Sequence, residues 1–151
     1  MPKKIKLILS ITGIILLGFL RGYIFYNTNW IYKTLTVGRI NQARSEFNFM
    51  LDWTVTEVVI FKWIMTFSFT ILFLGLSLLI IHYAFGQRKH LKAMSLVYAG
   101  LIGISGVLFL IGYIFGFSFE LYEVIHTIMM LAQSFVPVLI VWLVIKYIPS
   151  S

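Results

Sequence analysis

The sequence predicts an all-α protein: a four-helix transmembrane bundle with one outer, interfacial amphipathic helix between helices 1 and 2. Two observations predict this fold. Of the 151 residues, 60% are hydrophobic and 11% are charged, whereas a soluble domain averages about 45–50% apolar and about 25% charged residues. Four apolar stretches are also long enough to cross a hydrocarbon core of about 30 Å, which takes about 20 helical residues. We therefore expect one integral membrane domain over residues 1–151.

The first span is expected over residues 5–26. The basic residues Lys3, Lys4 and Lys6 lie before or at its start, as in the n-region of a secretory signal. Arg21 follows the apolar run at the place where a cleavage site would need small residues. We therefore expect an uncleaved signal anchor.

Arg21 is the most informative polar residue of this span, because a charge inside a membrane is costly unless it pairs or reaches water. Two interpretations remain open: the guanidinium snorkels to the outer headgroups, or it forms an ion pair with Glu57, Glu120 or Glu123. Gly18 and Gly22 flank Arg21 as a Gly-x-x-x-Gly pair, which lets a neighbouring helix approach closely. These two glycines are therefore predicted to be helix-packing residues.

The outer segment, residues 27–57, is too short to form a domain. Apolar residues recur within it at helical spacing, which predicts an amphipathic helix that lies flat on the outer leaflet or caps the bundle; they are Ile40, Ala43, Phe47, Met50 and Leu51. Thr54 and Glu57 then have the spacing of a capping box. This box predicts the start of the second span, residues 58–85.

The third span is expected over residues 91–115. Small residues follow one stripe of this helix, and close backbone packing is what such residues provide in lipid; they are Ser95, Ala99, Gly103 and Gly106. The stripe is therefore predicted to be a packing face. Whether it packs within the chain or against another protein is left open by the sequence.

The fourth span is expected over residues 124–148. His126, Met130, Gln133 and Pro137 follow one another at spacings of four, three and four. Because Pro137 has no N–H, it leaves the carbonyl of Gln133 without its usual partner. The pattern indicates either an ordinary proline kink or the wall of a small polar notch formed by His126, Gln133 and Pro137.

The distribution of charge predicts the orientation. With four spans, the side that carries both termini has seven basic residues and no acid, and the other side has five basic residues and all five acids. Basic residues near span ends favour the cytoplasm, so both termini are expected there. The net charge of +7 is explained by this signal and by attraction to anionic headgroups. It does not require a nucleic-acid partner.

The composition also limits the chemistry. The chain has no cysteine, which excludes a thiolate metal site, a cysteine nucleophile and a disulfide scaffold. Ser118, His126 and Glu123 could be written as a triad, but no nucleophile-elbow sequence accompanies them. The histidines His82, His90 and His126 are divided between the two sides of the membrane. We therefore expect no catalytic residues, no metal and no cofactor.

The stretch Leu20 to Asn27, with arginine followed by a Phe-Tyr exit from the first helix, resembles the start of small multi-pass proteins encoded beside bacterial exosortases. Exosortases are membrane transpeptidases that process proteins carrying a C-terminal sorting signal. They use a catalytic cysteine with arginine and histidine, so the resemblance implies an accessory component and excludes the transpeptidase itself. It also implies the bacterial cytoplasmic membrane.

Two functions are consistent with these features. The first is a non-enzymatic membrane protein that binds lipid and another membrane protein, with an exosortase-type transpeptidase as the expected partner. The second is a subunit of a small oligomeric transporter or channel, suggested by Arg21, Gln133 and Pro137. A homo-oligomer is compatible with both.

Overall fold

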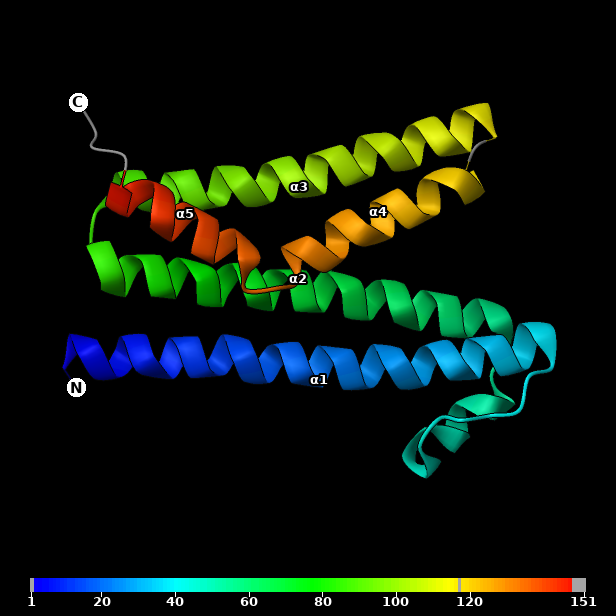
Figure 1. Ribbon diagram of the computed structural model, residues 1–151. Coiled ribbons are helices and arrows are strands. Elements are labelled where there is room, and N and C mark those ends of the chain that lie inside the picture. Colours follow the sequence, from blue (N-terminus) through cyan, green and yellow to red (C-terminus); the bar gives the residue numbers. More distant parts are fainter. Residues whose placement is uncertain (1, 117, 148–151) are drawn as a thin grey trace. The chain divides into compact units, whose positions relative to one another are not determined.

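The computed structural model describes residues 2–116 and 118–147, apart from the side chains of residues 118–120, 122 and 123. All regular structure within these ranges is helical (Figure 1). The elements are α1 (Lys3–Val37), the 3₁₀ helix η1 (Ser45–Asp52), α2 (Val55–Phe85), α3 (Arg88–Phe115), α4 (Ser118–Ala132) and α5 (Val136–Tyr147). The all-helical expectation is thus confirmed for this part of the chain.

Three helices, α1, α2 and α3, are each long and apolar enough to cross a membrane. The pair α4 and α5 passes the same test when its two helices are taken together, which gives up to four spans. Large apolar side chains are open to the surroundings along these helices, for example Phe19 at 74% and Leu96 at 76% exposure. Apolar surface of this extent is typical of contact with lipid or with a partner protein.

The contacts divide the chain into two units, Met1–Leu16 with Thr70–Ser151, and Leu17–Phe69. In the first unit, α3 contacts both α4 and α5. Its buried side chains include Ile14 of α1, Phe73 and Ile81 of α2, and Met94 and Tyr98 of α3. The Tyr98 hydroxyl lies 3.1 Å from Ser77 Oγ, so α2 and α3 share a buried hydrogen bond.

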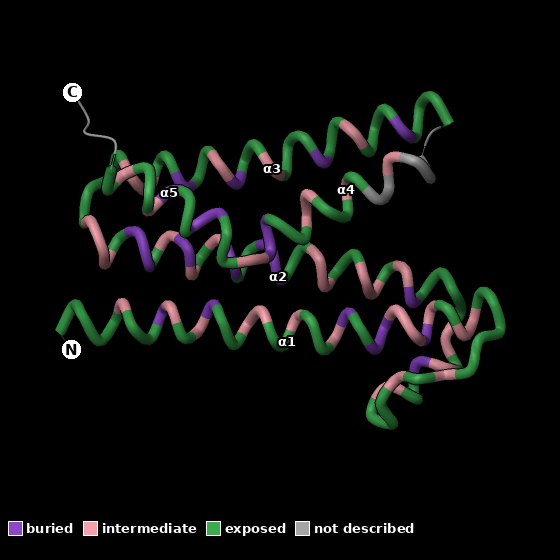
Figure 2. The backbone as a smooth tube through the Cα atoms, viewed as in Figure 1, coloured by how far each residue is buried: buried purple, intermediate pink, exposed green. Residues whose placement is uncertain are grey.

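The second unit has a small core of Ile31, Met50 and Val58, one residue each from α1, η1 and α2. All three side chains are fully buried. Half-buried apolar residues pack around them; they include Tyr32, Leu35, Ala43, Phe47, Leu51, Trp53 and Phe61. The segment between α1 and α2 therefore folds back onto the ends of these two helices (Figure 2).

Three helices end at glycines with positive φ, a backbone conformation that glycine adopts without strain. These are Gly38 after α1, Gly86 after α2 and Gly116 after α3. The amides of Gly38 and Gly86 donate to the carbonyls of Thr34 and His82. Only Gly86 and Gln87 separate α2 from α3, so these helices form a tight hairpin.

Helix α1 runs eleven residues beyond the predicted end of the first span at residue 26. The polar residues directly after residue 26 are accommodated within the helix. Thr28 Oγ1 donates to the carbonyl of Ile24 and Asn27 Nδ2 to that of Tyr23. The expected span and the helix therefore differ in extent, and the helix ends before Gly38.

The amphipathic helix expected in the outer segment is replaced by a loop and the 3₁₀ helix η1. Asn41 Oδ1 accepts a hydrogen bond from the Ala43 amide, an Asx turn that competes with helix formation. Met50 is buried as the apolar pattern predicts, but Ile40 is 85% exposed. The pattern thus identified most of the inward-facing residues, of which Phe47, Met50 and Leu51 lie in η1 and Ala43 lies in the loop before it.

The capping box is confirmed. The amide of Glu57 donates to Thr54 Oγ1 over 3.2 Å, and Glu57 Oε2 accepts from the Thr54 amide over 2.7 Å. The Thr54 hydroxyl also donates to Glu57 Oε2. Helix α2 accordingly begins at Val55.

Candidate functional sites

The fourth predicted span is broken between α4 and α5, which meet at a bend of 61°. Beside the break, Gln133 Nε2 donates to Thr70 Oγ1 of α2 over 2.9 Å. Both side chains are buried. A polar pair inside an apolar bundle is tolerated when its members bond to each other. The break and this bond together form the first candidate site, the polar notch.

Ser134 joins the two helix ends at the notch. Its hydroxyl donates to the carbonyl of Leu131 in the last turn of α4 and accepts from the amide of Val136 at the start of α5. Pro137 is buried at the second position of α5, where it needs no helical amide partner. These features let the span bend while the Leu131 carbonyl and the Val136 amide keep hydrogen-bond partners.

His126 is the third residue that the sequence predicts for the polar notch. It lies in α4 with an exposed side chain, whereas Gln133 and Pro137 are buried. The helical spacing that related these residues in the sequence ends at Ala132, where α4 stops. Thr70 is the functional candidate that sequence reasoning missed, because α2 carries several hydroxyl residues and nothing in the pattern distinguishes this one.

Ser105 is a second polar group inside the first unit. Its side chain is 5% exposed. Among the described residues, its Oγ is the buried side-chain atom that lacks a hydrogen-bond partner. Such atoms are uncommon in folded proteins, because burial without a partner costs free energy.

Arg21 lies in the second unit with its guanidinium carbon 5.0 Å from the centroid of the Phe25 ring. Aromatic faces attract cations at this distance. The side chain is half-buried, so the protein covers one part of it and leaves the other part exposed.

Glu57 is out of reach of Arg21. The Phe25 and Phe69 rings pack at 6.2 Å, and Lys62 Nζ lies 4.9 Å from the Tyr32 ring centroid, so α1 and α2 run antiparallel. In this register Glu57 lies level with the end of α1 near Val37, some 16 residues or about 24 Å beyond Arg21. The other two predicted partners, Glu120 and Glu123, have side chains outside the described residues.

The small-residue stripe of α3 faces away from the rest of the first unit. Ala99, Gly103 and Gly106 are exposed. A Cβ added to Gly103 or Gly106 would meet no described atom within 4 Å, whereas one on Gly13 would lie 3.5 Å from Leu76 Cδ2. The stripe thus leaves space along the helix that the described part of the chain does not fill.

Gly18 and Gly22 of α1 are similarly open, since a Cβ on either would meet nothing within 4 Å among the described residues. The predicted close approach of a helix at this pair stays a prediction. Gly13 is the glycine of α1 at which close packing is seen.

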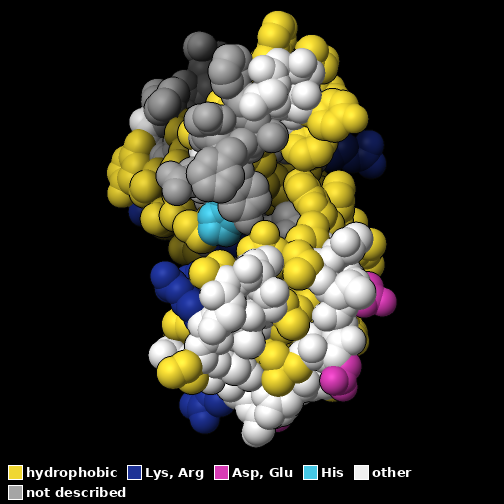
Figure 3. Space-filling model, turned by 90° about the vertical axis from the view of Figure 1, so that its right-hand side faces the viewer, with side chains coloured by type: hydrophobic (Ala, Val, Ile, Leu, Met, Phe, Trp, Pro, Cys, Tyr) yellow, Lys and Arg dark blue, Asp and Glu magenta, His cyan; other side chains and the backbone are white. Residues whose placement is uncertain are grey.

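The outer segment is attached to α1 by Asn27. This side chain is 1% exposed, and its Oδ1 accepts a hydrogen bond of 2.7 Å from the Arg44 amide. In the lower half of Figure 3, where residues 38–54 lie with the adjoining helix ends, basic side chains gather on one margin and acidic ones on the other. The segment therefore presents a polar, charged surface above an anchored apolar core.

Comparison of the chain with protein-family models, with curated protein sequences and with solved structures gave no match.

Proposed function

We propose that this chain is a non-enzymatic, multi-pass membrane protein that binds another membrane protein through α3. The observation that carries the proposal is the open stripe of Ala99, Gly103 and Gly106. Helices associate in lipid through close van der Waals packing of small residues, because lipid provides no hydrophobic force between them. A stripe of this kind that remains open within its own unit suits a helix from another chain.

The expected partner is an exosortase-type transpeptidase of the bacterial cytoplasmic membrane. This part of the proposal rests on the resemblance of residues 20–27 to proteins encoded beside such enzymes. The proposed role is accessory: the chain would hold or orient the enzyme, and the enzyme would supply the catalytic residues. Both termini are placed in the cytoplasm by the charge distribution.

Pull-down in mild detergent tests the proposal. The tagged chain is co-expressed with an exosortase-type enzyme, and the complex is measured by size-exclusion chromatography with light scattering. We expect co-elution, lost when Gly103→Leu and Gly106→Leu are combined, because two leucines would block close approach. Gly75→Leu is the matched control, since Gly75 is also open but lies on α2. Recovery of the monomer alone, without partner or self-association, would reject the proposal.

A second function, a subunit of an oligomeric transporter or channel, is favoured by the polar notch. Discontinuous helices near the middle of a membrane are common at the substrate sites of transporters. The buried bond between Gln133 and Thr70 lies at such a break. Uptake or conductance in reconstituted vesicles, abolished by Gln133→Leu and retained by Gln42→Leu in the outer segment, would support this function over the first.

A further inference from the structure

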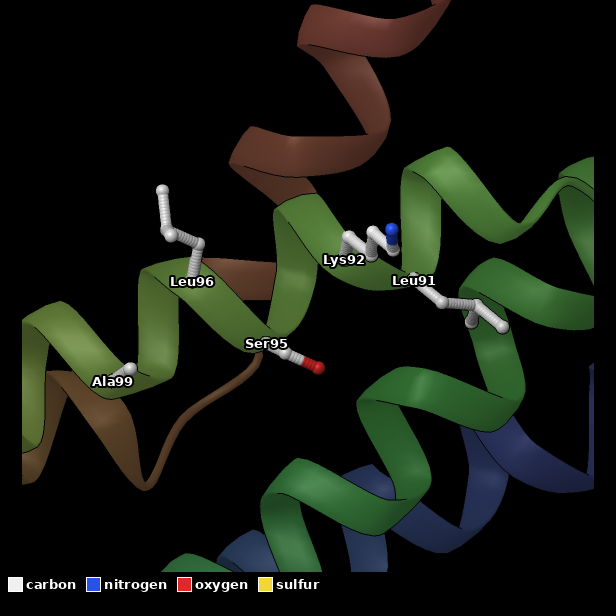
Figure 4. Close-up of a pocket in the computed structure, with 5 residues that line it drawn as sticks. All are labelled: Leu91, Lys92, Ser95, Leu96 and Ala99. Atoms are coloured by element: carbon white, nitrogen blue, oxygen red, sulfur yellow. The ribbon is translucent and has the colours of Figure 1, made fainter.

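A shallow groove lies on the first turns of α3 and shares Ala99 with the open stripe of the proposed function. It is lined by Leu91, Lys92, Ser95, Leu96 and Ala99, all on this one helix (Figure 4). Residues 91, 95 and 99 form one ridge of the helix and residues 92 and 96 the next, because side chains four positions apart are neighbours. Ser95 and Ala99 are small, while Leu96 is 76% exposed and stands above them.

The chemistry of the groove changes along its length. Lys92 is exposed at one end, and Arg88 lies one helical turn closer to the start of α3. Toward Ala99 the lining is apolar except for the Ser95 hydroxyl. One cation and one hydroxyl are few contacts for a compact polar ligand, but this arrangement suits an amphipathic molecule with a charged head and an apolar tail.

The end of the first unit that holds Lys92 is strongly basic. Besides Arg88 and Lys92, it carries Lys3 near the start of α1, with its Nζ close to Gly86, and Lys6, whose Nζ lies 5.8 Å from the Tyr83 ring centroid. The chain's acidic residues are at positions 46, 52, 57, 120 and 123, none of them in the segments that form this end. The local charge therefore favours an anion.

Aromatic residues place this end at the headgroup level of a bilayer. Lys146 Nζ lies 4.9 Å from the Trp142 ring and 5.2 Å from the Tyr147 ring. Tryptophan and tyrosine near basic residues are typical of the membrane interface. From Lys92 the groove then extends over seven residues, or about 10 Å, in the direction of the hydrocarbon core.

We propose that this groove binds one anionic phospholipid, with its phosphate at Arg88 and Lys92 and an acyl chain along Leu91, Ser95, Leu96 and Ala99. The proposal goes beyond the partner-binding function and does not rest on it. A partner helix would lie over Gly103 and Gly106 and would share only Ala99 with the groove, and it would gain nothing from the cation at Lys92. A phospholipid would contact both the basic residues and the apolar ridge.

Lipid retention by the purified full-length chain tests this site. The protein in detergent is titrated with phosphatidylglycerol or with phosphatidylcholine of the same acyl chains, and bound lipid is counted by native mass spectrometry. We expect phosphatidylglycerol to be retained at least tenfold more tightly. Arg88→Gln combined with Lys92→Gln should weaken that retention about tenfold or more, since each basic residue adds to the attraction of anionic headgroups.

Two matched controls separate a built site from general charge. Lys33→Gln combined with Arg39→Gln removes the same charge elsewhere in the chain and should leave retention unchanged. Ala99→Leu should fill the groove and lower retention, whereas Ala93→Leu, on the same helix outside the lining, should not.

Three results would overturn the proposal. Equal losses in the two charge variants would indicate bulk electrostatics alone. Full retention by Ala99→Leu would show that no acyl chain lies in the groove. Displacement of the lipid by an equal concentration of glycerol 3-phosphate would identify a site for the free phosphate instead. The partner-binding function is tested with different residues, so its success or failure is independent of these results.

Discussion

Asn27 holds together two segments that are 17 positions apart in the sequence. Its amide nitrogen bonds within α1 and its amide oxygen bonds to the Arg44 amide, so both ends of a buried polar group are satisfied. The sequence could not single out this residue, because its outer partner is a backbone group and leaves no trace in the residue pattern. Arg21, by contrast, was identified by its charge alone.

Replacing Asn27 by leucine should loosen the outer segment. The Arg44 amide would lose its acceptor at a buried site, which costs about 1–3 kcal/mol. We expect faster tryptic cleavage after Arg39 and Arg44 in detergent, with Asn27→Asp nearer to the wild type because it retains an acceptor oxygen. Asn29→Leu, two residues further along α1, is the control. Equal cleavage of the Asn27→Leu and Asn29→Leu variants would contradict the anchoring role.

The bond between Gln133 and Thr70 should appear as coupling in a double-mutant cycle. Gln133→Leu and Thr70→Val are combined, and the free energy of unfolding is measured in mixed detergent. Hydrogen bonds between membrane helices contribute about 0.6 kcal/mol on average and up to about 1.7 kcal/mol, so we expect about 0.5–1.5 kcal/mol here. Additive effects of the two substitutions would show that the bond adds nothing to stability.

At the scale of the element, features fixed by residues within one helical turn could be predicted from the sequence. The backbone conformation of a longer segment could not. The capping box was read correctly because its two residues lie within one helical turn, where sequence spacing fixes distance. The outer amphipathic pattern identified inward-facing residues such as Met50, which packs against α1 and α2, but residues 40–44 form a loop in which Asn41 accepts a hydrogen bond from the Ala43 amide. The spacing of the apolar residues indicated which side chains turn inward. It did not indicate the backbone conformation of the segment, which depends on packing against other parts of the chain.

Removing the cap should destabilise the start of α2. Thr54→Ala eliminates the hydroxyl that accepts from the Glu57 amide, and loss of such a cap costs about 0.5–2 kcal/mol. Thr56→Ala, which leaves both capping residues in place, is the control. Hydrogen exchange should accelerate at the first amides of α2 in the Thr54 variant only. Unchanged exchange at these amides would mean that packing alone fixes the helix start.

For the whole molecule, the presence of several candidate spans followed from composition, because an apolar run of about 20 residues has few other uses; the described residues give three, or up to four if α4 and α5 together count as one. The way in which the helices pack against one another did not follow from composition. Small residues predicted where helices could approach, yet Gly103 and Gly106 remain open while Gly13, which the sequence analysis had not selected, packs against Leu76. Which of several glycines packs against another helix depends on the shapes of the whole helices. Residue spacing does not encode these shapes.

The orientation of the chain can be measured with reporter fusions. Fusions after Lys89 and after Lys146 should report the cytoplasm, and fusions after Ser45 and after Gly116 the outside, because the basic residues near span ends follow the positive-inside rule. Matched alkaline phosphatase and green fluorescent protein fusions at each position provide opposite signals. An outside signal at Lys89 would reverse the whole arrangement.

Helix α1 sets a limit on bilayer thickness. Between Lys6 and Arg21 it rises about 22 Å, less than a hydrocarbon core of about 30 Å. In a thin bilayer both charges can reach headgroups at once, while in a thick one Arg21 must be drawn inward or the lipid must compress around it, and such mismatch costs a fraction of a kcal/mol per Å. The chain should therefore unfold at higher temperature in 14-carbon than in 20-carbon lipids. Replacing Arg21 with leucine should remove that preference.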